Sequence, residues 1–141
     1  MSGGGPRAVC DASAGFDLLL AGIPGREVAA SLDDKQIHVP ALFALEVCAA
    51  ARARVLSGHL TVGRAGQVVT DVMRFPAVVW GHEPALLSRA WVLRDNITTY
   101  DAVYVALAEK LGAMLVTADR RLASAVQRFA SCAVVDTTSP T

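Results

Sequence analysis

Residues 114–122 have the sequence MLVTADRRL, in which an apolar run ends close to an acid and a helix-forming stretch follows. The run Met114–Thr117 is short and apolar, as expected for a strand that is buried on both faces. Asp119 is a residue type that caps helix N-termini, and we expect a helix from there to about Arg128. A strand and a helix joined at an acid indicate an α/β protein.

The same strand-then-helix unit recurs along the chain. Ala8–Cys10 predicts a first strand, which ends at Asp11 and is followed by a helix over Ser13–Ala21. Pro40 suits the first turn of a helix that follows a second strand. The other expected strands are Ile37–Val39, Ala77–Trp80 and Ala133–Val135, and the other expected helices are Gly25–Leu32, Pro40–Ser57, Val62–Arg74, Pro84–Arg94 and Thr98–Leu111. This alternation favours a parallel sheet with helices on both faces.

Length and composition are those of one folded domain. The chain has 141 residues, of which 53% are apolar and 18% charged, and this composition excludes a disordered chain. We expect residues 1–7 to form a flexible N-terminal tail and residues 8–141 a single domain. The apolar excess predicts either a fully covered sheet or a self-association surface.

The charges and cysteines exclude several classes of protein. Thirteen basic and thirteen acidic residues cancel, so the chain lacks the basic excess of a general nucleic-acid-binding domain. Cys10, Cys48 and Cys132 form no C-x-x-C pair, which argues against zinc and disulfides and favours reduced thiols in a cytoplasmic protein. No apolar run reaches about 18 residues, so we expect no membrane span.

Four acids stand where a parallel sheet would bring them together. Asp11 and Asp119 follow strands, and the carboxyl ends of parallel strands meet at one edge. Asp101 lies in the first turn of a predicted helix, and Glu46 lies about two turns into another helix that starts from this edge. Crowded carboxylates repel one another, and a hard cation such as Mg²⁺ or Mn²⁺ offsets their charge. A cation held there can activate water or assist phosphoryl transfer.

Each acid also has a structural explanation to be weighed. Asp119 alone is a good helix cap, and Asp101 alone favours the helix dipole. Asp11 has no obvious neutralising neighbour in the sequence. Glu46 is the least expected acid, because its helix is apolar on nearly every side, and we expect a metal or an arginine partner for it.

Four stretches of the sequence resemble the PIN-domain family, specifically the VapC-type toxins of toxin–antitoxin pairs. They are VCDASA at residues 9–14, PALFALEV at residues 40–47, TYDAVYVALAE at residues 99–109 and LVTADRRL at residues 115–122. The resemblance implies a three-layer α/β/α sandwich with a parallel five-stranded sheet. It also implies a Mg²⁺- or Mn²⁺-dependent ribonuclease whose acidic quartet is Asp11, Glu46, Asp101 and Asp119.

The resemblance further implies roles and partners. Asp11 and Asp101 would be direct ligands, whereas Glu46 and Asp119 would act through water or a second metal. The protein would form a homodimer, and a cognate antitoxin would thread into the acidic groove.

Other polar residues would assist the quartet. By the resemblance, Thr117 and Ser13 would support metal-bound water or phosphate. Arg52 and Arg54 follow Glu46 on its helix, where they either contact RNA or antitoxin or form a solvated face. Many relatives carry Asn three residues after the helix Glu, but here that position is Ala49.

Two other functions remain open at this stage. A catalytically silent PIN-like module would bind RNA or protein without cutting, although none of the four acids is missing. An aspartyl-phosphate phosphatase usually has an acid two residues after its nucleophile, and here Ser13 stands at that position. The RNA target and the antitoxin do not follow from the sequence.

Overall fold

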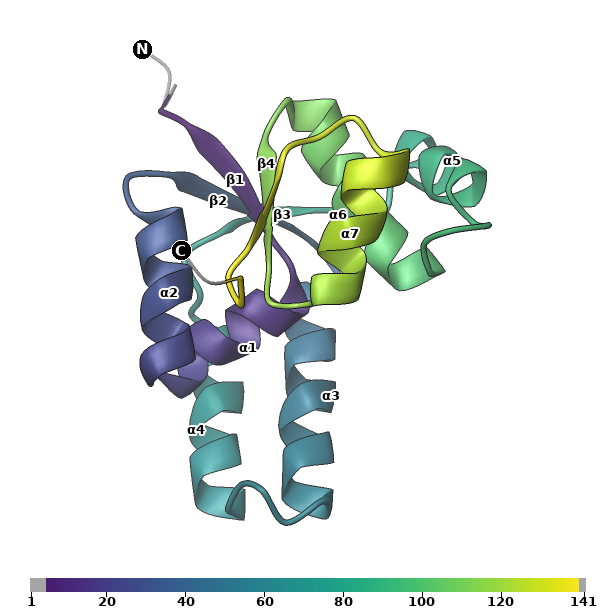
Figure 1. The fold of residues 1–141 in the computed structure, drawn as a ribbon. Coiled ribbons are helices and arrows are strands. Elements are labelled where there is room, and N and C mark those ends of the chain that lie inside the picture. Colours follow the sequence, from purple (N-terminus) through teal and green to yellow (C-terminus); the bar gives the residue numbers. More distant parts are fainter. Residues whose placement is uncertain (1–4, 140–141) are drawn as a thin grey trace.

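The computed structural model describes residues 5–139 and contains a five-stranded sheet (Figure 1). All neighbouring strands are parallel, and their order is β3-β2-β1-β4-β5. The strands are β1 (Arg7–Cys10), β2 (Gln36–Pro40), β3 (Val78–Trp80), β4 (Met114–Thr117) and β5 (Val134–Asp136). The five-stranded parallel sheet that we expected is therefore confirmed.

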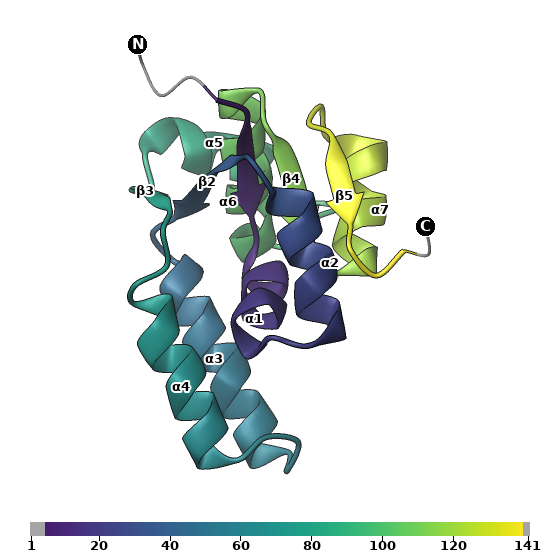
Figure 2. The same ribbon diagram turned by 90° about the vertical axis from the view of Figure 1, so that its left-hand side faces the viewer.

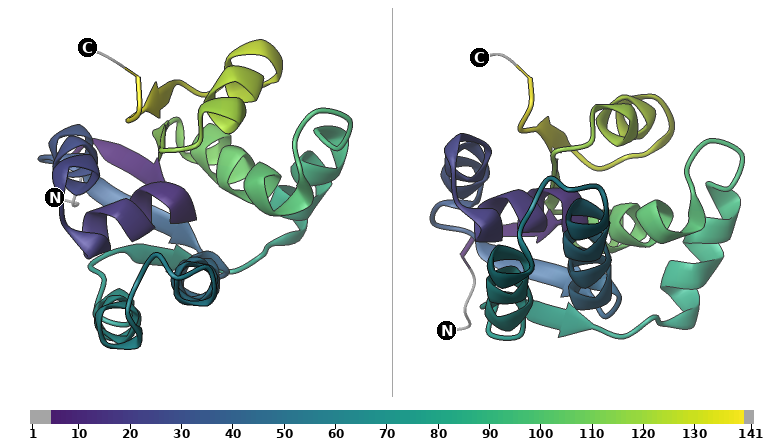
Figure 3. Two further views of the ribbon diagram at one scale, coloured as in Figure 1. Left: turned by 60° about the horizontal axis from the view of Figure 1, so that its bottom comes forward. Right: turned by 90° about the horizontal axis from the view of Figure 1, so that it is seen from below.

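Helices cover both faces of this sheet. They are α1 (Ala12–Leu20), α2 (Ile23–Leu32), α3 (Phe43–Leu56), α4 (Val62–Val72), α5 (Pro84–Val92), α6 (Thr99–Leu111) and α7 (Arg120–Phe129). Helices α1 and α2 lie on one face, and α6 and α7 lie on the other with α5 packed outside α6 (Figure 3). The pair α3 and α4 packs against α1 and extends beyond the sheet (Figures 1 and 2). The predicted three-layer sandwich is confirmed.

Two predicted boundaries need correction. Pro40 is the last residue of β2, aligned with Trp80 of β3, and α3 begins only at Phe43. A proline has no N–H to donate, so it suits the end of a strand as well as the first turn of a helix. Arg7 pairs with Gln36, so β1 begins inside the predicted tail. Residues 1–4 of that tail lie outside the described residues.

The core explains most of the apolar composition. Ala8–Cys10 of β1 and Leu115 and Val116 of β4 are fully buried, because helices cover both faces of these strands. In α6, all residues from Ala102 to Ala108 are buried, since this helix lies between the sheet and α5. Within residues 5–139, no helix is both long and apolar enough to cross a membrane.

The strand order creates a switch point between β1 and β4. The chain moves outward from β1 to β2 and β3, and then returns to place β4 on the other side of β1. The helices that follow β1 and β4 therefore leave the sheet on opposite faces, and in sheets of this kind ligands bind outside the carboxyl ends of such strands. Asp11 follows β1 directly and Asp119 follows β4 after one residue, so the fold positions both acids at this edge of the sheet.

Candidate active site

Asp11 is the most buried of the four acids, with 3% of its surface exposed. It caps α1, and its Oδ1 accepts a hydrogen bond from the backbone N–H of Ala14 at 2.9 Å. The Ser13 hydroxyl donates to the same oxygen at 2.7 Å, and the Thr117 hydroxyl donates to Oδ2. Three donors, two from α1 and one from the end of β4, thus fix the orientation of this carboxylate.

Ser13 and Thr117 connect the two strand ends. The Ser13 hydroxyl oxygen accepts from the Ala118 N–H at 3.0 Å, and that of Thr117 accepts from the Asp119 N–H at 3.0 Å. Each hydroxyl has one proton, and in both cases Asp11 receives it. The two side chains therefore hold Asp11 in place, while their predicted support of metal-bound water or phosphate stays a prediction.

The other three acids share a different pattern. Oε1 of Glu46 accepts from the Tyr104 hydroxyl at 2.7 Å, and Oδ2 of Asp101 accepts from the Thr98 hydroxyl at 3.1 Å. Oδ1 of Asp119 accepts the backbone N–H groups of the first turn of α7. In each acid the second carboxylate oxygen has no hydrogen-bond donor among residues 5–139. These oxygens are available to a ligand.

The electrostatics link the four acids through Asp101. Burial raises the pKa of Asp11 to about 6, and repulsion from Asp101 adds to this rise. Burial and then Asp101 also raise the pKa of Glu46, although the hydrogen bond from Tyr104 opposes the change. The pKa of Asp101 is raised by burial and by the charge of Asp119. Asp101 therefore interacts electrostatically with each of the other three acids, and a common metal site made of all four stays a prediction.

The four acids offer carboxylate oxygens, the type of ligand that hard divalent cations prefer. None of the four acids has an ion pair with a basic side chain in the part of the chain that the structure describes. The same residues contain no three acid, histidine or cysteine side chains close enough to hold one ion together. Mg²⁺ usually keeps several waters and uses only one or two carboxylates, so a looser set of oxygens suits it. An all-oxygen set also argues against zinc.

Tyr104 is a site residue that we did not assign from the sequence. Its hydroxyl supplies the partner of Glu46, where we expected a metal or an arginine. The side chain is 1% exposed, and burial and then the hydrogen bond to Glu46 hold its pKa well above the usual range. Tyr104 stands three residues after Asp101, on the same face of α6, and this spacing was the available signal.

The predicted contacts Arg52 and Arg54 are exposed on α3. The Arg54 guanidinium lies 4.9 Å from the centre of the Phe16 ring, and its charge counteracts the rise in the pKa of Asp17 caused by burial. Arg54 is eight residues beyond Glu46, or about 12 Å along the helix. Contact of either arginine with RNA or antitoxin stays a prediction.

Comparison with known proteins identifies the family. The PIN domain model matches residues 8–127. Ribonuclease VapC12 of Mycobacterium tuberculosis is 39% identical over 115 residues, which cover 82% of this chain and 88% of that protein. Ribonuclease VapC3 of the same species is 39% identical over 121 residues, with 84% and 87% covered. The chain belongs to the PIN domain family, and within it to the VapC type.

Solved structures support the same fold. PAE2754 from Pyrobaculum aerophilum matches with a TM-score of 0.64 and 25% identity, over 92% of this chain and 83% of that one. A chain of a toxin–antitoxin complex from Klebsiella pneumoniae matches with a TM-score of 0.61 and 18% identity, over 94% and 99%. At 18% identity the second likeness shows the fold alone.

Proposed function

We propose that this protein is a divalent-metal-dependent endoribonuclease that acts as the toxin of a type II toxin–antitoxin system. The observation that carries the proposal is the group of four acids in which Asp101 raises the pKa of Asp11 and Glu46, and Asp119 raises that of Asp101, without a basic partner among residues 5–139. Relatives named as ribonucleases and similar along most of the chain support RNA as the substrate.

The four acids would divide the work of holding the cation. The cation would be Mg²⁺ or Mn²⁺, with Asp11 and Asp101 as its direct ligands. Glu46 and Asp119 would act through water or a second ion. Bound there, the cation supplies a water of lowered pKa and offsets negative charge on the phosphodiester. Asp11 is already oriented by three donors, so it needs little rearrangement to accept a ligand.

Supporting side chains would control the orientation of the acids. Tyr104 holds one oxygen of Glu46 and leaves the other free to accept a proton or a water. Ser13 and Thr117 hold Asp11 and connect the ends of β1 and β4. Hydrogen-bonded partners of this kind fix ligand geometry, and their loss typically costs about 10- to 100-fold in metal affinity or activity.

The proposed partners are RNA, a cognate antitoxin and a second copy of the chain. Arg52 and Arg54 remain proposed contacts to RNA or antitoxin. The side chains of Leu45, Leu87, Trp91 and Tyr100 are exposed, and such apolar surface favours self-association. The free cysteines agree with a cytoplasmic location. Sedimentation equilibrium of the antitoxin-free chain should give twice the chain mass, and a monomer at all concentrations would contradict the dimer.

RNA cleavage by the purified, antitoxin-free chain tests the proposed activity. We expect cleavage of RNA with Mg²⁺ or Mn²⁺, and complete loss of cleavage with EDTA. The Asp11→Asn variant should be inactive with either ion. Intact RNA under all metal conditions would contradict the proposal, and RNA binding without cleavage would favour the silent PIN-like module.

A further inference from the structure

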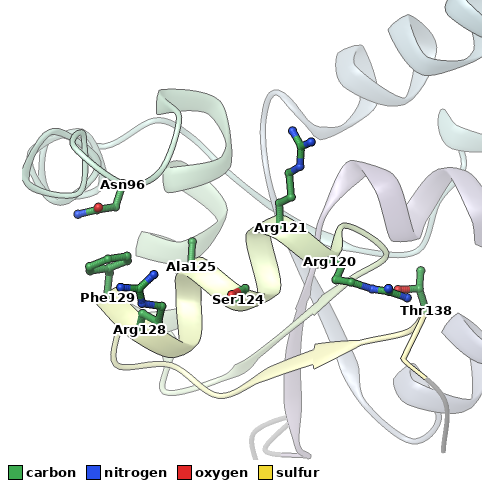
Figure 4. Close-up of a pocket in the computed structure, with 8 residues that line it drawn as sticks. All are labelled: Asn96, Arg120, Arg121, Ser124, Ala125, Arg128, Phe129 and Thr138. Carbon is green, nitrogen blue, oxygen red and sulfur yellow. The ribbon is translucent and has the colours of Figure 1, made fainter.

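A groove of about 800 Å³ runs along the solvent-facing side of α7 (Figure 4). Arg120, Arg121 and Arg128 line it together with Ser124, Asn96 and Phe129. The core side of the same helix consists of apolar residues that are buried against the sheet. The helix thus presents its polar face to the groove, and neither the acid site nor the fold requires three arginines there.

The lining of this groove is basic, although the chain as a whole is neutral. Among residues 5–139, no carboxylate side chain lines the groove. The nearest acid partner is Asp136, whose Oδ2 lies 4.0 Å from the Arg120 Nε. Arg121 and Arg128 have no ion pair within residues 5–139. Guanidinium groups bind phosphate through two parallel N–H donors, so two such groups in one groove favour a ligand with several phosphates.

The spacing along α7 fits an extended ligand. Arg120, Ser124 and Arg128 are four residues apart from one to the next, which places them on one side of the helix. The first and last of them are about 12 Å apart along the helix axis. A free phosphate ion would reach only one end of this groove, whereas a polynucleotide backbone contacts both ends.

The far end of the groove offers an aromatic ring. Phe129 is 39% exposed, and the Arg128 guanidinium lies 5.0 Å from the centre of its ring. Figure 4 shows these two side chains beside Asn96, while Arg121 stands near the start of the helix. An exposed ring beside a guanidinium is a platform on which an unpaired base stacks.

We infer that this groove binds single-stranded RNA, with its arginines on the backbone phosphates and Phe129 against a base. The inference rests on the proposed function, which makes RNA the substrate. It extends that function because α7 begins immediately after Asp119, so a strand that crosses the four acids continues along the arginines. The groove would supply the local positive charge that the neutral chain otherwise lacks.

Binding without cleavage tests this inference. The probe is a fluorescently labelled 12-nucleotide oligouridylate, titrated with the full chain in EDTA at several salt concentrations. The groove variant is Arg121→Gln with Arg128→Gln. A matched control is Arg26→Gln with Arg74→Gln, which removes two exposed arginines from α2 and from the end of α4. Circular dichroism melting of each variant checks that it is folded.

We expect the groove variant to lose at least tenfold in RNA affinity at low salt, while the control changes less than threefold. The slope of log affinity against log salt should fall by about 1.4, since each phosphate contact to a single strand contributes about 0.7. A Phe129→Ala variant, which keeps every charge, should weaken binding without changing this slope. Equal affinity and slope in the groove variant and the wild type would overturn the inference.

Two further measurements separate this inference from its alternatives. If polyglutamate binding falls in the groove variant while RNA binding does not, the groove belongs to an acidic protein and the inference fails. The Asp101→Asn variant should bind the oligonucleotide through the groove even though it cannot cut. If the wild-type chain binds RNA through the groove but never cleaves it, the proposed nuclease activity is wrong and the RNA-binding role of the groove still holds.

Discussion

The acid site and the arginine groove are neighbours in the chain but opposite in charge. Asp119 belongs to the acidic group, and Arg120 and Arg121 of the groove follow it directly. In the acidic group, burial and mutual repulsion raise the pKa values of Asp11, Glu46 and Asp101. In the groove, Arg120, Arg121 and Arg128 are exposed, and its lining holds no acid among residues 5–139. We therefore propose that the first region performs the chemistry and the second binds the substrate.

Removing one carboxylate should therefore damage cleavage far more than binding. Asp101→Asn removes the charge that repels both Asp11 and Glu46 and that is itself repelled by Asp119. We expect cleavage to fall by more than about 100-fold, because loss of a ligand exceeds the effect of losing its supporting partners. Initial rates on labelled RNA in Mn²⁺ measure this. A fall of less than tenfold would remove Asp101 from the site.

The buried charge of Asp11 should cost stability in the metal-free protein. Its pKa rises from 3.8 to about 6 on folding, so the folded state prefers the neutral acid and stability decreases as pH rises through this range. At pH 7.5 the ionised group costs about 3 kcal/mol. We expect Asp11→Asn to raise the free energy of unfolding by up to that amount at pH 7.5, and by much less at pH 4.

Urea unfolding in EDTA at the two pH values measures this difference. Asp33→Asn is a matched control, because Asp33 is exposed at the end of α2. Its unfolding free energy should stay close to that of the wild type at both pH values. Destabilisation of Asp11→Asn at pH 7.5 would contradict this prediction and would mean that the hydrogen bonds to Asp11, including its cap of α1, outweigh the cost of its buried charge.

Loss of the Tyr104 hydroxyl, the partner of Glu46, should have an intermediate effect on the cleavage rate. Tyr104→Phe keeps the buried ring but removes the hydroxyl that donates to Oε1. We expect cleavage to fall by about tenfold, with the pH dependence shifted upward because Glu46 loses a bond that lowers its pKa. Circular dichroism melting checks that the Tyr104→Phe variant is folded. A cleavage rate equal to that of the wild type would make Tyr104 a core residue only.

Neutralising the two arginines of α3 should have the smallest effect, and this effect is on RNA affinity. Arg52→Gln with Arg54→Gln removes two exposed charges that start about 9 Å along the helix from Glu46. At physiological salt this is about one screening length, so we expect RNA affinity to fall by twofold to threefold, roughly the effect of a weak surface charge. The oligonucleotide titration measures it. A larger loss of RNA affinity than in the groove variant would indicate that RNA binds along α3 and not along α7.

The sequence predicted the sheet well because its signals are local. Short apolar runs such as Met114–Thr117 and capping residues such as Asp119 determine where strands and helices begin. Pro40 was assigned to the wrong element, because a fixed φ and a missing N–H suit the last residue of β2 as well as a helix start. Local signals do not distinguish these two positions.

The arrangement of the four acids and their hydrogen-bond partners follows only in part from the sequence. Asp11 and Asp119 could be placed at one edge because parallel strands align their carboxyl ends. The contact between Tyr104 and Glu46 joins residues 58 positions apart, and the link from Thr117 to Asp11 joins residues 106 apart. Such contacts depend on how α3, α6 and β4 pack against their neighbours, which no local pattern reports. The groove on α7 likewise could not be recognised from the sequence, because it depends on the position of Asn96 beside Phe129.

Binding of Mn²⁺ to the RNA-free protein tests the central claim most directly. Electron paramagnetic resonance measures the free ion as the chain is titrated, so the result does not depend on activity. We expect at least one Mn²⁺ per chain, displaced by Mg²⁺, with binding lost in Asp101→Asn and retained in Asp33→Asn. No bound Mn²⁺ in the wild type, or equal binding in Asp101→Asn, would contradict the assignment of these four acids to a metal site.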